Sequence, residues 1–519
     1  MNRSKIILGI NAFHADSSAC LIIDGELIVA LEEERINRVK HYSGFPYNAI
    51  KECLSIGGVN EKDITDIAFN TKPFSNIIPK GFHYIKNFSL KDSLLKKQFL
   101  KKKNIKKILN KNLNLNKKIK FHYIEHHLAH IASAFYPSEF KKANGLSIDG
   151  SGDFVSFAHA TCENNQIVIK KKNYFPNSLG IFYHAMTQFL GFQNYGDEYK
   201  VMGLAAYGKP IYFQKIKENI FKNSKELFSL NLDFFNHQKK NFKYVADENL
   251  VIDKIFNSKL EKIFSKEIND ENFQKNFASS VQKVYEYFFK KIINSIIKKK
   301  YSKNIVFSGG CALNSSANKF ITDKSDIFKK VFINCAPGDN GGALGAAFVV
   351  SAKYNQRPTN IKSPFLGKEF NKDQIKEILK KDRYSKKLTF DYLNSDEELF
   401  KTASKFIVNE KVIGWFQGKM EFGPRALGNR SILADPRNPN MKEIINKKIK
   451  RRESFRPFAP SVLEEFQSEW FESDFFNPYM SSLATVREEK RKIIPAVTHF
   501  DNTARLQTVN KSLNLKFYG

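Results

Sequence analysis

One arrangement of short apolar segments occurs twice in the chain and limits the folds that it can adopt. Residues 5–38 contain an apolar stretch, a polar loop (HADSS) and two further apolar stretches joined by Asp24-Gly25, which is a hairpin signal. Residues 145–172 repeat this order with GLSID, the glycine-rich loop GSGD and a second hairpin pattern. Such a recurrence predicts a duplicated unit, in which a polar loop follows the first strand of each copy. Backbone N–H groups in loops of this kind can face a phosphate.

Helical and strand-like segments alternate elsewhere in the chain, which indicates an α/β architecture. Residues 276–300 have a helical pattern, and the apolar segments IVFSGG and VFINCAPG follow it. A chain of 519 residues is too long for one ordinary core, so we expect two or three domains. The polar stretch 353–384, which contains Pro358, Pro364 and Gly367, marks a boundary. The expected parts are a first domain over 1–355, a linker over 356–384 and a second domain over 385–519.

The composition favours a cytoplasmic protein without a membrane span. No run of about 18 apolar residues occurs, and the first apolar stretch is soon interrupted by Asn11, His14 and Asp16, which makes a poor signal peptide. The 5 cysteines are scattered, with no CxxC pair and no pattern typical of a disulfide framework. This usage suits a reducing compartment.

The formal net charge of +31 allows two interpretations. A basic protein can bind nucleic acid or phosphate-rich substrates. Bidentate phosphate recognition would favour arginine, but lysine dominates here. We therefore explain the positive charge by the codon bias of an AT-rich gene. The same question arises for the lysine-rich segment 91–120, whose spacing predicts an amphipathic helix. We interpret it as a solvated helical insertion rather than an RNA- or membrane-binding helix.

A group of histidines and carboxylates could hold a metal ion. The segment EHHLAHIASAFYP predicts a helix on which His126 and His130, four residues apart, share one face. His127 and His130 are an alternative pair, and a surface or capping role for these histidines is a third possibility. Candidate carboxylates follow at strand ends, with Asp149 in GLSID and Asp339 in APGDNGG. Two imidazoles and two carboxylates suit Fe(II), Mn(II) or Zn(II) better than calcium.

The first polar loop contains a candidate base, His14, beside Asp16, Ser17 and Ser18. An imidazole titrates near neutral pH, so His14 could accept a proton from a hydroxyl group. The alternative is that His14 is an ordinary polar loop residue.

Two glycine-rich segments, SGGCALN and GDNGGALGAAF, precede expected helices. Glycine allows a nucleotide to approach the backbone, and a helix N-terminus favours phosphate. Neither segment ends in the GK[ST] of a Walker A sequence, and helix packing would explain them equally well.

The run GKMEFGPRALGNRSILADPR is the most distinctive stretch of the chain. Lys419, Arg425 and Arg430 lie in it, and Arg456 follows. The planar guanidinium group matches phosphate oxygens, so these residues are candidates for a phosphate site. Surface salt bridges are the alternative.

These motifs together resemble the carbamoyltransferase family that includes the nodulation, cephamycin and tobramycin O-carbamoyltransferases. The resemblance extends over nearly the whole chain, with the motifs in the order found in the family. It rests on INAFHADSSACLIIDG, ALEEERINRVKHYSGFP, EHHLAHIASAFYPS, SIDGSGD, GDEYKVMGLAAYG, SGGCALN, APGDNGGALGAAF, GPRALGNRSILADPR, SFRPFAPSV and HFDNTARLQTV.

The resemblance implies a duplicated Kae1-like domain, of the fold shared with actin and sugar kinases, followed by a YrdC-like domain. In this family the YrdC-like module makes carbamoyl-adenylate from carbamoyl phosphate and ATP. The Kae1-like module then binds this intermediate beside a metal and passes the carbamoyl group to a hydroxyl of the acceptor. We therefore expect a divalent metal, preferably Fe(II) and otherwise Mn or Zn. ATP with Mg and a small-molecule or sugar acceptor are the further expected partners, whereas nucleic acid is not expected.

The resemblance also implies roles for individual residues. The metal ligands would be His126, His130, Asp149 and Asp339, and the catalytic base would be His14. Carbamoyl-adenylate or its nucleotide would contact Lys200, Gly203, Ser308, Gly309, Gly310 and Asn314. Carbamoyl phosphate and the ATP phosphates would contact Lys419, Arg425, Arg430, Arg456 and Arg505.

The chain departs from the family pattern at its end. Family members usually continue past TARLQTV through an NTSFN-like motif, whereas this sequence ends at LKFYG, so we expect a shortened YrdC-like module. Two rival functions are a tRNA threonylcarbamoyl transferase, whose substrate would suit the positive charge, and a nucleotide-binding protein without catalytic activity. The GPRALGNRS segment and the HADSS loop favour the O-carbamoyltransferase.

Overall fold

The chain forms two compact units. The first comprises residues 1–362 with 481–483, and the second comprises 363–480 with 484–519. The computed structural model describes residues 4–87, 104–224, 226–239, 243–246, 250–264, 270–323, 327–358, 363–381 and 387–519.

The division between the units falls within the stretch expected as a linker, 356–384. Residues 363–381 nevertheless belong to the second unit. Phe365 forms a β-bridge with Glu421, and the ring of Phe370 lies 6.0 Å from that of Phe416. The expected linker is therefore too long, because proline and polar residues there form an ordered edge of the second unit.

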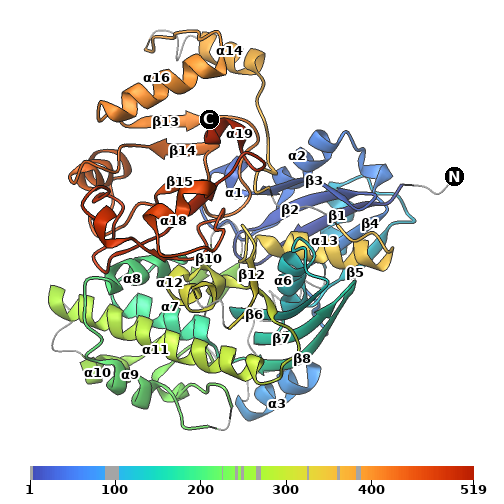
Figure 1. The fold of residues 1–519 in the computed structure, drawn as a ribbon. Coiled ribbons are helices and arrows are strands. Elements are labelled where there is room, and N and C mark those ends of the chain that lie inside the picture. Colours follow the sequence, from blue (N-terminus) through green and yellow to red (C-terminus); the bar gives the residue numbers. More distant parts are fainter. Residues whose placement is uncertain are drawn as a thin grey trace. The chain divides into compact units, whose positions relative to one another are not determined.

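The first unit contains two five-stranded sheets (Figure 1). The strands of the first sheet are β1 (Ile6–Asn11), β2 (Ser18–Ile23), β3 (Glu26–Glu32), β4 (Asp66–Phe69) and β5 (Lys120–Tyr123). Those of the second are β6 (Lys142–Gly152), β7 (Val155–Glu163), β8 (Gln166–Tyr174), β11 (Asn304–Ser308) and β12 (Lys330–Ile333). A separate ribbon is formed by β9 (Tyr244–Ala246) and β10 (Leu250–Ile252).

The two sheets have the same strand order and directions. In the first, β1, β2 and β3 are antiparallel, and β1, β4 and β5 are parallel. In the second, β6, β7 and β8 are antiparallel, and β6, β11 and β12 are parallel. The strands and hairpins predicted within 5–38 and 145–172 are confirmed. The loop 12–17 after β1 and the irregular end of β6 at 149–152 therefore occupy corresponding places in the two sheets.

The helices of the first unit include the two predicted from the sequence. Residues 276–300 lie mostly in α11, and EHHLAHIASAFYP forms α6. The described helices are α1 (Glu34–Asn37), α2 (Tyr47–Gly57), α3 (Ile77–Asn87), α5 (Ile105–Asn112), α6 (His126–Phe135), α7 (Leu179–Phe189), α8 (Glu198–Ala205), α9 (Phe213–Ile220), α10 (Ser258–Phe264), α11 (Glu271–Ile297), α12 (Ser315–Thr322) and α13 (Gly341–Lys353).

The helix α13 packs against β1 and α6 and is buried over most of its length (Figure 1). Glycine permits this packing. A Cβ atom on Gly345 would lie 1.7 Å from the carbonyl oxygen of Ala129, and one on Gly9 would lie 2.3 Å from that of Ala343. Close packing thus accounts for part of the glycine-rich GDNGGALGAAF segment.

The second unit is built from short elements around small apolar clusters. Its strands are β13 (Ile413–Phe416), β14 (Arg430–Leu433), β15 (Ser461–Leu463), β16 (Ala484–Thr485), β17 (Thr503–Ala504) and β18 (Gln507–Val509), all in two-stranded pairs. Its helices include α14 (Lys372–Lys380), α16 (Asp396–Val408), α17 (Met441–Ile444), α18 (Gln467–Trp470) and α19 (Leu515–Tyr518). One cluster contains Phe471, Val486 and Leu506, and another contains Met441 and Ile445.

Two further expectations concern the lysine-rich segment 91–120 and membrane-spanning helices. Much of the lysine-rich segment 91–120 lies outside the described residues. Its described part contains α5, in which Ile105 and Leu109 are buried. Among the helices that the structure describes, none is long and apolar enough to cross a membrane.

Candidate metal centre and arginine cluster

The helix α6 carries two histidines whose imidazole nitrogens meet. The helix begins after Glu125, whose side chain accepts a hydrogen bond of 2.9 Å from the N–H of Leu128 and caps it. His126 and His130 follow at a spacing of one turn, and their Nε2 atoms lie 3.0 Å apart. Both residues are buried, with exposed fractions of 1% and 0%. Two nitrogen donors are thus presented together, away from bulk water.

Two carboxylates complete the cluster. Asp149 lies near the end of β6, and Asp339 precedes α13. Asp149 Oδ2 lies 3.3 Å from His126 Nε2 and 3.9 Å from His130 Nε2, and Asp339 Oδ1 lies 3.3 Å from both nitrogens. One donor atom from each of the four residues lies within 4.8 Å of the other three. The fold therefore gathers all four residues to which the family resemblance assigned metal ligation.

The charges of this cluster fit a divalent cation. Burial lowers the pKa of His126, but hydrogen bonds to Asp149 and Asp339 outweigh burial and raise it to about 10. Burial raises the pKa of Asp339, but hydrogen bonds from His126 and His130 hold it well below its usual range. A cation that binds here would displace the proton that His126 shares with the two carboxylates. Two imidazoles and two carboxylates are donors that suit Fe(II), Mn(II) or Zn(II).

The alternative histidine pair, His127 with His130, is wrong. Nε2 of His127 lies 2.8 Å from the carbonyl oxygen of Val155, to which it donates, and Nδ1 lies 2.8 Å from Ser147 Oγ. Both ring nitrogens are therefore engaged by the strands β6 and β7. Burial and repulsion from neighbouring histidines lower the pKa of His127 to about 3, so the ring is neutral.

The loop after β1 brings His14 to the metal-ligand cluster. The centroid of its ring lies 4.8 Å from that of His126, and the residue is only 4% exposed. The side-chain amide of Asn11 donates to the carbonyl oxygens of Ala15 and Asp16, at 3.0 Å each, and thereby fixes the loop. A candidate base from the first sheet thus lies beside ligands from the second half of the unit.

The SGGCALN segment orients Asp149. The N–H of Gly310 donates to Asp149 Oδ1 over 2.9 Å. Gly309 has a φ of +88°, and a Cβ atom there would lie 2.3 Å from the carbonyl oxygen of Ile148. Ser308 is buried at the end of β11. These contacts give the segment a supporting role next to the metal ligands.

The remaining residues expected to contact the nucleotide lie on α8 and at α12. Asn314 caps α12, and its side-chain amide donates to Gln282 Oε1 over 3.1 Å. Lys200 and Gly203 lie on α8, where the ammonium group of Lys200 lies 3.0 Å from a carboxylate oxygen of Asp197. These contacts hold local structure, and a nucleotide role for the three residues stays a prediction.

Arg430 does not have the surroundings expected of a phosphate ligand. Its guanidinium group donates to the carbonyl oxygens of Gln417 (2.6 Å), Asn429 (2.8 Å), Gly418 (3.1 Å) and Lys368 (3.3 Å). It also lies 3.6 Å from the centroid of the Phe416 ring. These contacts hold the surrounding loops, and the phosphate role expected of Arg430 stays a prediction. Lys419, from the same motif, is exposed.

Other basic residues of the second unit form a cluster of like charge. Burial lowers the pKa of Arg505 well below its ordinary value, and repulsion from Arg425, Arg452 and Arg456 lowers it further. Burial lowers the pKa of Arg425 to about 10. Burial, with repulsion from Arg452 and Arg456, also lowers the pKa of Lys450. Cations that repel one another in this way favour a bound anion. We call Arg425, Arg452, Arg456 and Arg505 the arginine cluster.

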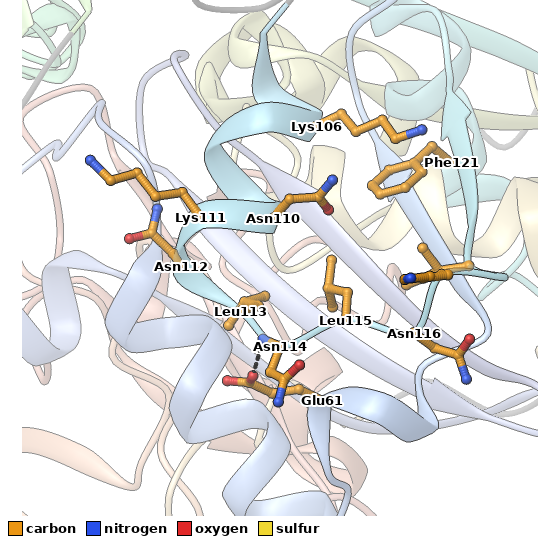
Figure 2. A pocket seen from close by; sticks show the side chains of 12 residues that line it. Glu61, Lys106, Asn110, Lys111, Asn112, Leu113, Asn114, Leu115, Asn116 and Phe121 are labelled. Atoms are coloured by element: carbon orange, nitrogen blue, oxygen red, sulfur yellow. Dashed lines mark hydrogen bonds between the residues drawn. The ribbon is translucent and has the colours of Figure 1, made fainter.

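A polar hollow of about 670 Å³ lies elsewhere on the first unit, against α5 and β5 (Figure 2). Its lining includes Lys106, Asn110 and Phe121, together with Glu61, which accepts a hydrogen bond from the N–H of Asn114. It contains none of the residues expected at the site.

Comparison with known families identifies the family of the chain. A model of the carbamoyltransferase N-terminus matches residues 6–348, and a model of the carbamoyltransferase C-terminus matches residues 404–519. The chain belongs to the carbamoyltransferase family. The first match includes every residue of the metal-ligand cluster, and the second includes the arginine cluster.

Some relatives match this carbamoyltransferase along nearly its whole length, and others match part of it. An uncharacterized protein of Synechocystis sp. is 36% identical and covers 99% of this chain, which spans 88% of that protein. Nodulation protein NolNO of Sinorhizobium fredii is 33% identical over 98% of this chain and 72% of its own length. The 3'-hydroxymethylcephem-O-carbamoyltransferase of Amycolatopsis lactamdurans is 35% identical over 40% of this chain and 37% of its own length. Among solved structures, HypF of T. kodakarensis aligns with a TM-score of 0.33 and 15% identity, over 69% of this chain and 49% of HypF.

Three further residues of this carbamoyltransferase support the sites but were given no role from the sequence. Arg452 belongs to the arginine cluster. Glu32 accepts a hydrogen bond of 2.5 Å from the side chain of Asn340, next to Asp339. Asp153 contacts the backbone of His126. All three lie in polar segments of the sequence, but their partners are distant along the chain.

Proposed function

We propose that this carbamoyltransferase uses carbamoyl phosphate and ATP to make carbamoyl-adenylate and transfers the carbamoyl group to a hydroxyl of a small-molecule or sugar acceptor. The observation that carries the proposal is the position of His14 beside the four converging donors His126, His130, Asp149 and Asp339. The O-carbamoyltransferase activity in the name of the cephem relative supports a hydroxyl acceptor.

His14 would accept the proton of the acceptor hydroxyl on an imidazole nitrogen as the oxygen attacks the carbamoyl carbon of carbamoyl-adenylate. The bond from that carbon to the phosphate oxygen would break, and AMP would leave. Its burial and its fixed loop limit water access and hold the ring in one place. His126, His130, Asp149 and Asp339 would hold a divalent ion, for which we favour Fe(II) over Mn or Zn. A bound cation supplies a Lewis acid for the carbonyl or phosphate oxygen.

The arginine cluster would bind carbamoyl phosphate and the phosphates of ATP bound with Mg. A carbamoyl carbon is a poor electrophile, and adenylation gives it a good leaving group. Arg505 is the strongest candidate for an anion contact, because its buried Nε has no partner among the described residues and three other arginines repel it. Lys200, Gly203, Ser308, Gly309, Gly310 and Asn314 would lie on the nucleotide side of the metal centre.

The proposal extends to the finer fold and location. The identical strand order of the two sheets supports a duplicated Kae1-like domain. We assign a YrdC-like fold to the second unit on the family resemblance alone. All 5 cysteines are free thiols, which supports a cytoplasmic location.

The activation half-reaction tests this proposal without knowledge of the acceptor. Purified, metal-loaded protein should release pyrophosphate from ATP only when carbamoyl phosphate is present. Arg505→Ala should lower this rate at least 100-fold, because a buried charge-assisted contact to phosphate is lost. The control is Arg437→Ala, since Arg437 is an exposed arginine that pairs with Asp435.

Pyrophosphate release that does not depend on carbamoyl phosphate would contradict the proposed donor. Equal rates in Arg505→Ala and Arg437→Ala would contradict the proposed anion site. Activity restricted to tRNA would favour the threonylcarbamoyl alternative.

A further inference from the structure

The backbone of the metal-ligand candidate His126 has an anchor outside its own helix. Asp153 Oδ2 accepts hydrogen bonds from the N–H of His126 (3.0 Å) and from the N–H of Lys72 (2.7 Å). Asp153 Oδ1 accepts one from the hydroxyl of Thr71 (2.9 Å). The Asp153 carboxylate, which follows β6 of the second sheet, therefore joins the first turn of α6 to the loop after β4 of the first sheet.

Asp153 itself is held in an uncommon backbone conformation. Its φ is +49°, and that of Phe154 is +73°. The side-chain amide of Asn76 donates to the carbonyl oxygen of Asp153 over 2.9 Å. Lys172 in turn donates to Asn76 Oδ1 over 3.1 Å and lies 3.6 Å from a carboxylate oxygen of Glu125, the cap of α6. These contacts thus connect Asp153 a second time to the N-terminus of α6, through Asn76, Lys172 and Glu125.

The ring of His126 is also in contact with the residue next to Asp153. A metal-bound histidine normally donates its second ring N–H to a carboxylate, carbonyl or water, which fixes the ring. Nδ1 of His126 has no protein partner among the described residues. The ring instead packs on Gly152, where a Cβ atom would lie 2.0 Å from its Cδ2. Gly152 and Asp153 therefore both constrain His126, one at its ring and the other at its backbone.

We propose that Asp153 is a positioning residue of the metal centre, which fixes the first turn of α6 and so aims His126 at the shared ion. Asp153 is not a ligand in this scheme. It links metal occupancy to the loop that contains Thr71 and Lys72, and thus to the first sheet. The inference rests on the metal centre of the proposed function but not on the identity of the carbamoyl donor or acceptor.

Co(II) is the probe for this role, because its visible absorption reports both binding and ligand geometry. Asp153→Gly removes the carboxylate, and glycine adopts a positive φ without strain. We expect its dissociation constant for Co(II) to rise about tenfold or more, as for other outer-sphere partners of metal ligands. Asp153→Asn should stay within about threefold of the wild type, because an amide oxygen can accept both N–H bonds while its NH₂ faces Thr71.

The matched control is Thr71→Val, which removes one bond to Asp153 but leaves its contact with His126. It should change Co(II) affinity by less than about twofold. Asn76→Ala provides a milder second variant if Asp153→Gly does not fold, and it should also weaken Co(II) binding because it frees the carbonyl group of Asp153. Melting temperatures of the metal-free variants, measured in parallel, distinguish a loss of fold from a change in the orientation of His126.

Unchanged Co(II) affinity in folded Asp153→Gly or Asn76→Ala would overturn the proposal. An equal loss in Thr71→Val would overturn it too, because general loosening of the loop would then explain the effect. Absence of Co(II) binding by the wild type would remove the metal centre and this role together. Normal Co(II) binding without carbamoyl-phosphate-dependent pyrophosphate release would count against the proposed reaction alone.

Discussion

Two adjacent histidines show how strongly local partners decide the chemistry of a side chain. His126 is held protonated by two carboxylates, whereas His127 is neutral between a hydroxyl and a carbonyl group. The helical spacing predicted both pairs, His126 with His130 and His127 with His130. It could not choose between them, because the choice depends on strands that begin more than ten residues later. Asp149 and Asp339 could be nominated from the sequence, but their convergence required the fold.

This contrast predicts different outcomes for two histidine variants. His130→Gln should weaken Co(II) binding at least 100-fold, because it removes a ligand from the cluster. His127→Gln should leave the Co(II) affinity within about threefold of the wild type but lower the free energy of unfolding by about 1–3 kcal/mol, since buried partners lose their hydrogen bonds. Co(II) titration and urea unfolding measure the two effects. Loss of Co(II) binding in His127→Gln would restore the alternative pair.

The irregular end of β6, which leads into the turn at Asp153 and Phe154, carries one ligand and packs against another. Its four residues, DGSG, contain two glycines with different surroundings. A Cβ atom on Gly152 would meet the ring of His126, whereas one on Gly150 would meet nothing within 4 Å. The sequence predicted a polar glycine-rich loop here. It could not distinguish the glycine that packs under a ligand from the one that does not.

The two glycines at this end of β6 form a matched pair for mutation. Gly152→Ala should weaken Co(II) binding at least tenfold and lower the free energy of unfolding by about 1–3 kcal/mol, because either the ring or the turn must move. Gly150→Ala should change stability by less than about 0.5 kcal/mol and leave binding intact. Both variants can be compared by Co(II) titration and thermal melting. Equal effects at the two positions would contradict the packing described for His126.

Helices and strands could be predicted where their sequence pattern is local. They could not be predicted where contacts between distant residues determine the structure. The strands β1 to β3 and β6 to β8 follow from alternation and turn residues, and α6 follows from its helical spacing. The composition of 363–381 predicted part of a linker. It could not reveal that Phe365 in this stretch pairs with Glu421 of the second unit. The bonds from Arg430 to four carbonyl groups could not be seen in its motif either, and its phosphate role stays a prediction.

At the scale of the whole molecule, buried neutral histidines make stability depend on pH. Burial, with repulsion from Lys299 and Lys171, lowers the pKa of His159 to about 4. Burial also lowers the pKa of His237 to about 4, although its bond to the carbonyl oxygen of Pro176 opposes this. Both values lie below the roughly 6.5 of an unfolded histidine. Their stabilising contribution is therefore complete above pH 6.5 and is lost as the pH falls toward 4.

We accordingly expect metal-free protein to lose about 1.4 kcal/mol of unfolding free energy per pH unit for each of these histidines between pH 6.5 and 4. His159→Gln should have a smaller slope by that amount, because glutamine does not take up a proton. Urea unfolding at pH 7, 6 and 5 measures the slopes. Parallel slopes in the two proteins would show that His159 does not titrate as its burial implies.

The corresponding places in the two sheets have a final consequence. The loop after β1 carries His14, and the matching end of β6 carries Asp149. Two sheets with the same strand order therefore contribute different groups to one point. Neither sheet carries the group that the other supplies. A substitution that displaces either His14 or Asp149 should therefore impair the site even when the other sheet is intact.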